Sequence, residues 1–258
     1  MAIVHREVTL LDFDETFDWQ PALVSRARCR VDMRDVAGTR LFCTEEAFDE
    51  IRRRLSRRVG RGVTFLGSGD RHYVTLALLA EISRPFDLVL FDRHADMATC
   101  AGSVEETPGL LSCGTWLDEA FERLPNLRRA ILIGLSEEAA RRALQSRWCG
   151  RLVVLTGVSD GLGGFARFTN VCGEEVYISV DKDVLDRAFA ATNWDHGSMR
   201  LDSLTEALRM LVRAKYVVGA DVCGEMPAAP VDRWRLSRLS RLNERANIAI
   251  LDALLACG

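Results

Sequence analysis

Residues 86–96 read Phe-Asp-Leu-Val-Leu-Phe-Asp-Arg-His-Ala-Asp, an apolar run that ends in three side chains able to bind a metal ion. Asp92, His94 and Asp96 occupy every second position. Successive side chains of an extended strand point to opposite faces, so residues spaced by two share one face. This stretch therefore predicts a buried strand that delivers three ligands to one side of its end.

A second strand end repeats the pattern later in the chain. Residues 175–183 read Glu-Val-Tyr-Ile-Ser-Val-Asp-Lys-Asp, so an apolar strand again ends in two carboxylates at spacing two. Two such strands side by side would form a carboxylate-rich metal site. Strand alternation places Lys182 on the opposite face from Asp181 and Asp183, away from any bound ion.

The order of apolar segments predicts an α/β fold. Strand-like runs alternate with amphipathic helical patterns, which indicates parallel strands joined by crossover helices. No linker interrupts the alternation, so we expect one domain over residues 1–258. Strands are expected near 7–12, 62–66, 87–92, 129–134, 152–155, 175–180 and 215–220, and helices near 44–58, 70–83, 137–147, 202–213 and 241–256, with Thr44, Ser136 and Asp202 as helix N-caps.

Strand ends and long loops indicate where a functional site lies. In an open parallel sheet, ligands bind beyond the carboxyl ends of the strands. Asp92, Asp181 and Asp221 each follow an apolar strand, and we expect them to open into one crevice. Long loops, which are usually functional in compact domains, are expected at 97–115, 156–173 and 184–201.

Composition and charge exclude several classes of protein. The 258 residues are 48% hydrophobic and 28% charged, as in an ordinary globular domain. The net charge is -3 and no long run of Lys or Arg occurs, so we expect neither a nucleic-acid nor a membrane partner. No apolar stretch has the length of a membrane span, and the N-terminus lacks the layout of a signal peptide, which favours a cytoplasmic location.

The types of ligand indicate the metal. Carboxylate and imidazole donors without a thiolate suit Mn²⁺ better than a structural zinc ion. A ligand set of this kind on two strands suits two ions that share a water, and one ion is the alternative. The eight cysteines are scattered without a C-x-x-C pair, and most are expected to be buried thiols. Cys113 and Cys223 are the exceptions, because both fall near the expected site.

With these two strand-end motifs the chain resembles the ureohydrolase family, which comprises arginases, agmatinases and formiminoglutamases. The family motifs D-A-H-x-D and S-x-D-x-D-x-x-D-P are similar to Asp92–Asp96 (Asp-Arg-His-Ala-Asp) and Ser179–Asp186 (Ser-Val-Asp-Lys-Asp-Val-Leu-Asp). Gly67–His72 (Gly-Ser-Gly-Asp-Arg-His) stands where the family has G-G-D-H, and Gly219–Val222 matches its G-x-D segment. The resemblance covers residues 60–228 and implies a three-layer αβα, arginase-like fold.

The resemblance also implies an activity and a set of site residues. We expect a metal-dependent hydrolase in which metal-bound hydroxide attacks a guanidinium- or amidine-type C–N bond of a small, cationic substrate. Asp96 would protonate the departing amine, and Glu225 would pair with the cationic group. We also expect a homo-oligomer. The metal ligands would be His72, Asp92, His94, Asp96, Asp181 and Asp183, and the substrate contacts Cys113, Asn193, Trp194 and Glu225.

The departures from the family fall on substrate contacts more than on metal ligands. Arg71 stands where the family has its histidine, so His72 would act one position later. Cys113 replaces the histidine of an H-G pair, and Gly224 replaces a glutamate that is adjacent here as Glu225. The substrate therefore stays open. Two alternatives remain: a deacetylase-like amide hydrolase with one ion, and a non-catalytic arginase-fold protein that binds a metal or a small molecule.

One rival motif lies near the N-terminus. Asp12–Thr16 reads Asp-Phe-Asp-Glu-Thr, which matches the D-x-D-x-T nucleophile motif of haloacid-dehalogenase-like phosphatases. Such an enzyme also needs a catalytic lysine downstream, and the only lysines are Lys182 and Lys215. The metal-ligand reading is therefore favoured.

Overall fold

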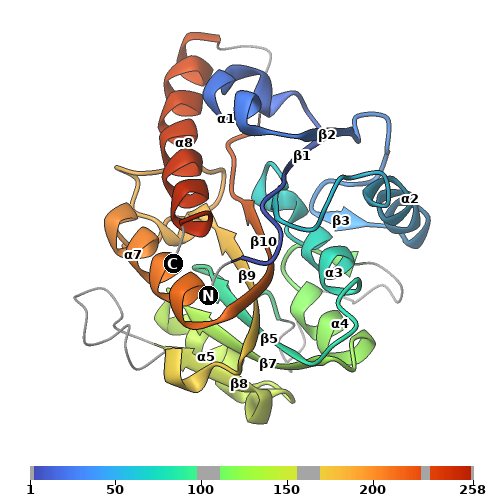
Figure 1. Ribbon diagram of the computed structural model, residues 1–258, viewed down its shortest axis with the longest axis vertical. Coiled ribbons are helices and arrows are strands. Elements are labelled where there is room, and N and C mark those ends of the chain that lie inside the picture. The colour runs from blue at the N-terminus through green and yellow to red at the C-terminus, as the bar shows by residue number, and fades with distance from the viewer. Residues whose placement is uncertain (1–2, 98–110, 156–168, 228–232, 257–258) are drawn as a thin grey trace.

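An eight-stranded sheet, in which every strand pair is parallel, forms the centre of the protein (Figure 1). The structure is a computed structural model and describes residues 3–97, 111–155, 169–227 and 233–256. The strand order is β2-β1-β4-β10-β9-β5-β7-β8. The strands are β1 (Val8–Asp12), β2 (Cys29–Asp32), β4 (Val63–Phe65), β5 (Phe86–Phe91), β7 (Leu127–Ile133), β8 (Leu152–Leu155), β9 (Glu175–Asp181) and β10 (Tyr216–Cys223); β3 (Phe42–Cys43) and β6 (Leu111–Ser112) form a separate antiparallel pair.

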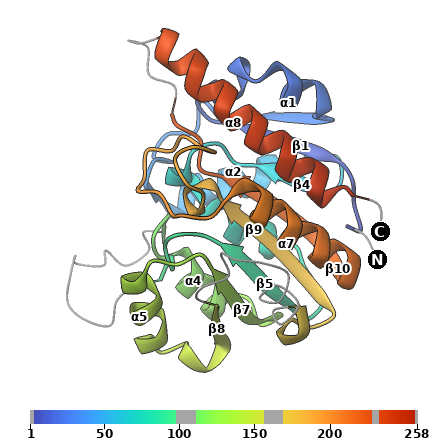
Figure 2. The ribbon, with the colours of Figure 1, turned by 90° about the vertical axis from the view of Figure 1, so that its left-hand side faces the viewer.

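Helices cover both faces of the sheet, which confirms the three-layer αβα arrangement (Figure 2). One face packs against α1 (Pro21–Arg26), α7 (Leu201–Ala214) and α8 (Arg233–Leu254). The other packs against α2 (Glu45–Leu55), α3 (Val74–Leu79), α4 (Trp116–Arg123) and α5 (Glu137–Gln145). Short 3₁₀ turns are η1 (Thr16–Trp19), η2 (Gly69–Arg71), η3 (Cys149–Arg151) and η4 (Lys182–Val184).

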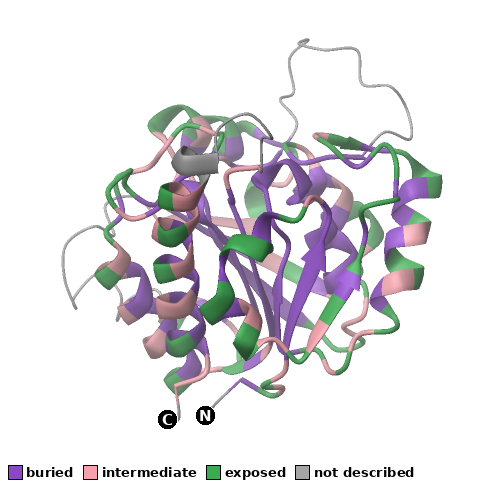
Figure 3. Cartoon of the chain, turned by 90° about the horizontal axis from the view of Figure 1, so that it is seen from above, coloured by how far each residue is buried: buried purple, intermediate pink, exposed green. Residues whose placement is uncertain are grey.

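Strand alternation divides the apolar side chains between these two layers. In β5, Val89 and Phe91 belong to the core under α7 and α8, whereas Leu88 and Leu90 belong to the core under α3 and α4. The central strands are buried along most of their length (Figure 3). Burial on both faces explains why their sequences are continuous apolar runs.

The predicted elements agree with the structure where the sequence pattern is strong. All seven expected strands are present, but β2 was missed because Arg30 and Asp32 are exposed at this edge of the sheet and interrupt its apolar pattern. The helices α1 and α4 were also missed. The expected helix at 70–83 is the 3₁₀ turn η2 followed by the shorter α3, and the helix expected at 241–256 begins already at Arg233.

Two of the three expected helix caps are confirmed. The side chains of Thr44 and Ser136 accept hydrogen bonds from the backbone N–H groups of Ala47 and Ala139. The prediction for Asp202 is wrong, because α7 begins at Leu201 and Asp202 lies inside its first turn. In that first turn the carboxylate still interacts favourably with the positive end of the helix dipole.

Of the three expected long loops, only 184–201 lies wholly within the described residues; 97–115 and 156–173 fall partly outside them. Within the described parts of the chain, no helix combines the length and the apolar character needed to cross a membrane.

The two aspartates of the D-x-D-x-T motif near the N-terminus form ion pairs with arginines. Asp12 contacts Arg30 at 2.8 Å, and Asp14 contacts Arg71 at 2.9 Å.

A fully buried ion pair joins the ends of β9 and β10 to α8. Lys182 is inaccessible to solvent and donates to both Glu225 and Asn247. The two carboxylate oxygens of Glu225 also accept hydrogen bonds from Gln20, Asn243 and Asn247 at 2.6 to 2.9 Å. Lys182 therefore points away from Asp181 and Asp183, as strand alternation predicted, and its charge is fully compensated.

We expect Lys182→Met to lower the free energy of unfolding by about 3 to 5 kcal/mol, because it leaves Glu225 buried without a counter-charge. Chemical denaturation measures this loss. The metal content of the folded protein should not change, since Lys182 faces α8 and not the carboxylate cluster.

Lys215→Met is the matched control, because Lys215 donates to the backbone carbonyl of Cys172 and pairs with no carboxylate in the described residues, so its loss should cost about 1 kcal/mol. The double variant Lys182→Met/Glu225→Leu should recover part of the stability, since neither buried charge remains. Equal losses for the two lysine variants would show that the buried pair is not a major contact.

Candidate metal centre

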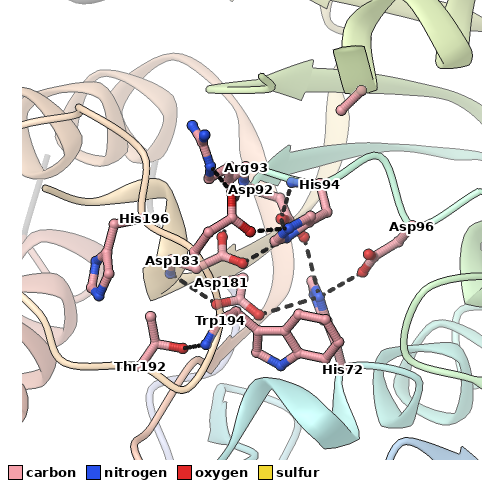
Figure 4. A network of polar contacts seen from close by, with 12 residues as sticks. His72, Asp92, Arg93, His94, Asp96, Asp181, Asp183, Thr192, Trp194 and His196 are labelled. Carbon is pink, nitrogen blue, oxygen red and sulfur yellow. Dashed lines mark hydrogen bonds and ion pairs between the residues drawn. The ribbon is translucent and has the colours of Figure 1, made fainter. Parts of the chain in front are cut away.

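The structure brings the six predicted metal ligands together at the carboxyl edge of the sheet (Figure 4). His72 ends the turn η2, and Asp181 ends β9. The register that pairs Phe91 of β5 with Val180 of β9 brings the segment after β5 beside Asp181. That segment carries Asp92, His94 and Asp96, and Asp183 follows in η4.

His72 lies at the centre of the first pocket. Its Nδ1 atom is 2.8 Å from Asp96 Oδ2, 3.3 Å from Asp92 Oδ2 and 3.7 Å from an oxygen of Asp181. Only 1% of His72 is exposed. Arg71 instead points toward Asp14, with its guanidinium over the ring of Phe13. The structure therefore directs His72, and not its neighbour, into the cluster.

A turn rich in glycine allows this placement. Gly67 adopts a φ of 85°, a left-handed conformation that glycine adopts without strain. A Cβ atom on Gly69 would lie 2.8 Å from Asp181 Oδ2, so only glycine lets η2 approach the cluster this closely. The 3₁₀ turn that follows then ends on His72.

His94 defines the second pocket. Its Nδ1 atom lies 2.8 Å from Asp183 Oδ2 and 3.6 Å from Asp92 Oδ1. Its Nε2 atom lies 2.8 Å from Asp195 Oδ1, which orients the ring from outside the cluster. About a third of the His94 side chain is exposed, so this pocket is the more open of the two.

A relay behind His72 sets the orientation of its ring. Ser179 donates to Asp221 at 2.8 Å, so the serine oxygen is free to accept from His72 Nε2 at 2.9 Å. In the neutral ring Nε2 then carries the proton and Nδ1 presents a lone pair to the cluster, a pattern typical of metal-binding histidines. Asp221 is held by Tyr177 and Ser179 and is not among the described residues that line the cavity, so the expectation that it opens into the crevice is wrong.

Asp96 is held in an unusual backbone conformation. Its φ of 49° lies in the left-handed region, which non-glycine residues rarely adopt. Trp116 Nε1 donates to Asp96 Oδ2 at 2.6 Å, and the backbone carbonyl of Asp96 accepts from Leu117. These contacts with the first turn of α4 aim the Asp96 carboxylate at His72.

The buried cluster shifts the proton affinities of its members. Burial, with the nearby charge of Asp96, raises the pKa of Asp92, and burial with the charge of Asp183 raises the pKa of Asp181. Burial would lower the pKa of His94, but hydrogen bonds with Asp183 and Asp92 outweigh it and raise this pKa to about 12. The cluster therefore holds protons that a bound cation would displace.

The donors fit divalent cations. Asp92 Oδ2 is buried without any hydrogen-bond partner, a costly state that a cation would relieve. Three groups of ligand atoms each lie within 4.8 Å of one another: His72 with Asp92 and Asp96, His72 with Asp181 and Cys223, and Asp92 with His94 and Asp183. Asp92 and His72 are each common to two groups, so adjacent ions would share ligands.

A cavity of about 320 Å³ opens onto both pockets. Of the predicted substrate contacts, Trp194 and Cys113 line it. Asn193 instead donates to Asp70 at 2.8 Å beside the cavity. Glu225 lies away from it in the network with Lys182, so the prediction that Glu225 pairs with a cationic substrate group is corrected.

Four polar residues that line this cavity are not predicted from the sequence. Asp195 follows Trp194, Ser136 caps α5, and Glu138 and Arg142 lie within that helix. Because α5 follows the carboxyl end of β7, the rule that ligands bind at that edge could have identified them. Glu138 forms an ion pair with Arg142, so the rim of the cavity carries both signs of charge.

Comparison with known proteins gives consistent matches. A family model described as the Arginase family matches residues 6–234. An uncharacterized protein of Thermotoga maritima is 31% identical over 249 residues, covering 96% of this chain and 89% of that protein. The agmatine ureohydrolase of Thermoplasma volcanium has a TM-score of 0.66 at 15% identity, covering 96% of this chain and 89% of that one. Proclavaminate amidino hydrolase from Streptomyces clavuligerus has a TM-score of 0.65 at 19% identity, covering 97% and 93%.

We expect Asp92→Ala or Asp181→Ala to abolish binding of both ions, because each carboxylate lies between the two histidine pockets. Elemental analysis of the purified variants measures the metal content. Asp202→Ala removes an exposed carboxylate far from the cluster and serves as the control. Full metal occupancy in either cluster variant would place the site elsewhere.

His72→Ala should remove one ion and leave the other. The pocket of His94, Asp92 and Asp183 does not need His72, so a titration of Mn²⁺ into the metal-free variant should show one site. His196→Ala is the matched control, because His196 contacts the carbonyl of Leu185 at 3.1 Å and is not among the described residues that line the cavity. An unchanged two-site isotherm for His72→Ala would exclude His72 from the centre.

The metal-free protein should lose stability as the pH rises above about 6.5, the ordinary value for histidine. The folded state keeps the His94 proton up to about pH 12, whereas the unfolded chain releases it near its ordinary pKa. The unfolded state then binds fewer protons, so the free energy of unfolding falls with pH. Thermal melts at pH 7 and pH 9, with and without Mn²⁺, measure this, and an equal fall in the metal-loaded protein would contradict it.

Proposed function

The chain belongs to the arginase family, and we propose that it is a metal-dependent hydrolase that cleaves a C–N bond of a small guanidino or amidino compound. The observation that carries this proposal is the convergence of six ligands into two adjacent pockets beneath one cavity. The solved relatives named as ureohydrolase and amidino hydrolase share this fold, which supports the same reaction class.

Two divalent cations fit the centre. The first would lie among His72, Asp92, Asp96 and Asp181, and the second among His94, Asp92 and Asp183, with Asp181 beside Asp183. Such a pair lowers the pKa of a shared water toward neutrality and places positive charge beside the carbon under attack. The oxygen-rich donors of the His94 pocket suit Mn²⁺.

Asp96 is placed to hold and give a proton. Its Oδ2 atom is engaged by Trp116 and lies beside His72, which leaves Oδ1 as the atom able to carry a proton toward the cavity. We assign Asp96 the role of the acid that protonates the departing amine. The rigid contacts with α4 would keep that proton in position during turnover.

The cavity favours a small substrate with a positive group. Its volume is about 320 Å³, and carboxylates of the centre line it. Since Glu225 is sequestered, Asp195 and Glu138 are the carboxylates outside the centre that line the cavity, and a cationic group would compete there with their partners Arg93 and Arg142. The ring of Trp194 packs against His94 at 5.7 Å between centroids and forms part of the wall.

The test is turnover by the metal-loaded protein on a panel of guanidino, amidino, formimino and N-acetyl compounds. We expect metal-dependent release of an amine, ammonia or urea from at least one guanidino or amidino compound. Asp183→Asn should abolish the reaction, whereas Asp202→Asn, a matched change at an exposed position, should not. The metal-to-protein ratio is measured in the same samples.

The other outcomes identify the alternatives. Hydrolysis of N-acetyl compounds alone, with one ion per chain, would indicate a deacetylase-like amide hydrolase built on the His94 pocket. Full metal content with no turnover on the whole panel would indicate a non-catalytic protein that binds a metal or a small molecule. Either result would overturn the proposed reaction.

A further inference from the structure

A thiol lies among the carboxylates of the His72 pocket. We propose that Cys223 is a ligand of the ion held by His72, so that this pocket takes a thiolate and selects a softer cation, such as Zn²⁺ or Co²⁺, over Mn²⁺. The inference deepens the proposed function, since it rests on the metal centre described above. It also makes the two pockets chemically different.

The sheet register places this thiol in the ligand row. Cys223 of β10 pairs directly with Asp181 of β9, and Asp92 follows β5 on the other side of Asp181. Strand alternation puts Cys223 on the same face as Asp221, which serves the relay to His72. The ends of β10, β9 and β5 thus place Cys223, Asp181 and Asp92 side by side on one face of the sheet.

Direct contacts agree with the register. The Cys223 thiol lies 3.1 Å from Asp181 Oδ2, and its sulfur, an oxygen of Asp181 and a nitrogen of His72 all lie within 4.8 Å of one another. All three side chains are buried, with Cys223 at 1% exposure. Zn–S and Zn–N bonds of about 2.0 to 2.3 Å fit between atoms at such separations.

A second observation points to an ion at this place. Asp92 Oδ2 is buried, has no hydrogen-bond partner and lies 3.3 Å from His72 Nδ1. The unpartnered oxygen and the thiol approach the same histidine from either side of β9. A cation among them would satisfy the oxygen and replace the weak S–H hydrogen bond to Asp181 with a metal–sulfur bond.

The residue after Cys223 makes room for this arrangement. Gly224 adopts a φ of 86°, and a Cβ there would collide with Asp181 Oδ1. The chain therefore turns without a side chain beside the cluster, and Glu225 leaves toward α8. Cys223 is the last side chain of β10 that reaches the pocket.

Binding through sulfur changes no oxidation state. The thiol proton leaves to solvent, the sulfur lone pair forms the bond to the cation, and one negative charge is added to the ligand set. Thiolate ligands favour Zn²⁺ and other soft to intermediate ions, whereas carboxylates favour Mn²⁺. The His94 pocket, whose grouped donors among the described residues are oxygen and nitrogen, would keep the harder preference.

The test is absorption spectroscopy of the full-length protein loaded with Co²⁺. A cobalt–thiolate bond gives a sulfur-to-cobalt charge-transfer band in the near ultraviolet, which oxygen and nitrogen ligands do not give. We expect the band in the native protein and its loss in Cys223→Ser. Co²⁺ should still bind that variant through the remaining ligands, as elemental analysis would show.

Cys113→Ser is the matched control, because Cys113 is also a buried thiol at the cavity but joins none of the ligand groups found among the described residues. It should keep the band. If Cys113→Ser loses the band and Cys223→Ser keeps it, the cobalt–sulfur bond belongs to Cys113, and the proposal is overturned. Stoichiometric Co²⁺ in the native protein without any band would overturn it as well.

Competition between ions gives a second readout. Cys223→Ser should weaken Zn²⁺ binding at the His72 pocket by roughly tenfold or more, while Mn²⁺ affinity changes little. Equal weakening of both ions would contradict a thiolate ligand. A charge-transfer band without turnover on the substrate panel would support Cys223 as a ligand and overturn the proposed hydrolysis. Turnover without the band would support the hydrolysis and overturn Cys223 as a ligand. Failure of the protein to bind Co²⁺ would overturn both proposals.

Discussion

Buried negative charge at the ends of two neighbouring strands governs this structure. Asp92, Asp181 and Asp183 are 1% to 3% exposed, and the cost of burying charges so close together must be offset by cations or protons. In the metal-free protein, protons on the two imidazoles and the raised pKa values of the carboxyl groups offset this negative charge. A site of this kind is unstable by itself, and its surroundings are organised to hold it.

The end of β9 shows how closely site and fold are coupled. Asp181 faces the cluster, and the next residue, Lys182, faces the opposite layer and anchors Glu225 against α8. One short segment therefore positions a metal ligand and fixes the packing of the C-terminal helix. Because the buried pair is fully hydrogen-bonded, the strand end cannot rotate without breaking both arrangements.

The two histidine pockets differ in access. His72 is enclosed, with the ring of Trp116 at 5.0 Å between centroids and the Ser179–Asp221 relay behind it. His94 is about one-third exposed and is steadied by Asp195 at the cavity. The enclosed pocket is suited to retaining an ion, and the open pocket is suited to meeting a substrate. This division follows from burial, and it does not depend on which substrate enters.

The sequence by itself determined the strands that carry the ligands, because burial on both faces requires apolar runs and spacing by two places Asp92, His94 and Asp96, and likewise Asp181 and Asp183, on one side. It also led to the family and to the three-layer fold. Only the tertiary structure showed that the turn carries His72 into the cluster, withdrew Glu225 from the cavity, placed the Cys223 thiol beside Asp181, and brought Glu138 to the cavity. Those outcomes depend on the path of a glycine turn, on sheet register, and on partners such as Gln20 and Asn247 that lie far away in sequence. Local spacing carries no record of such contacts, because they form only when separate strands and helices pack together.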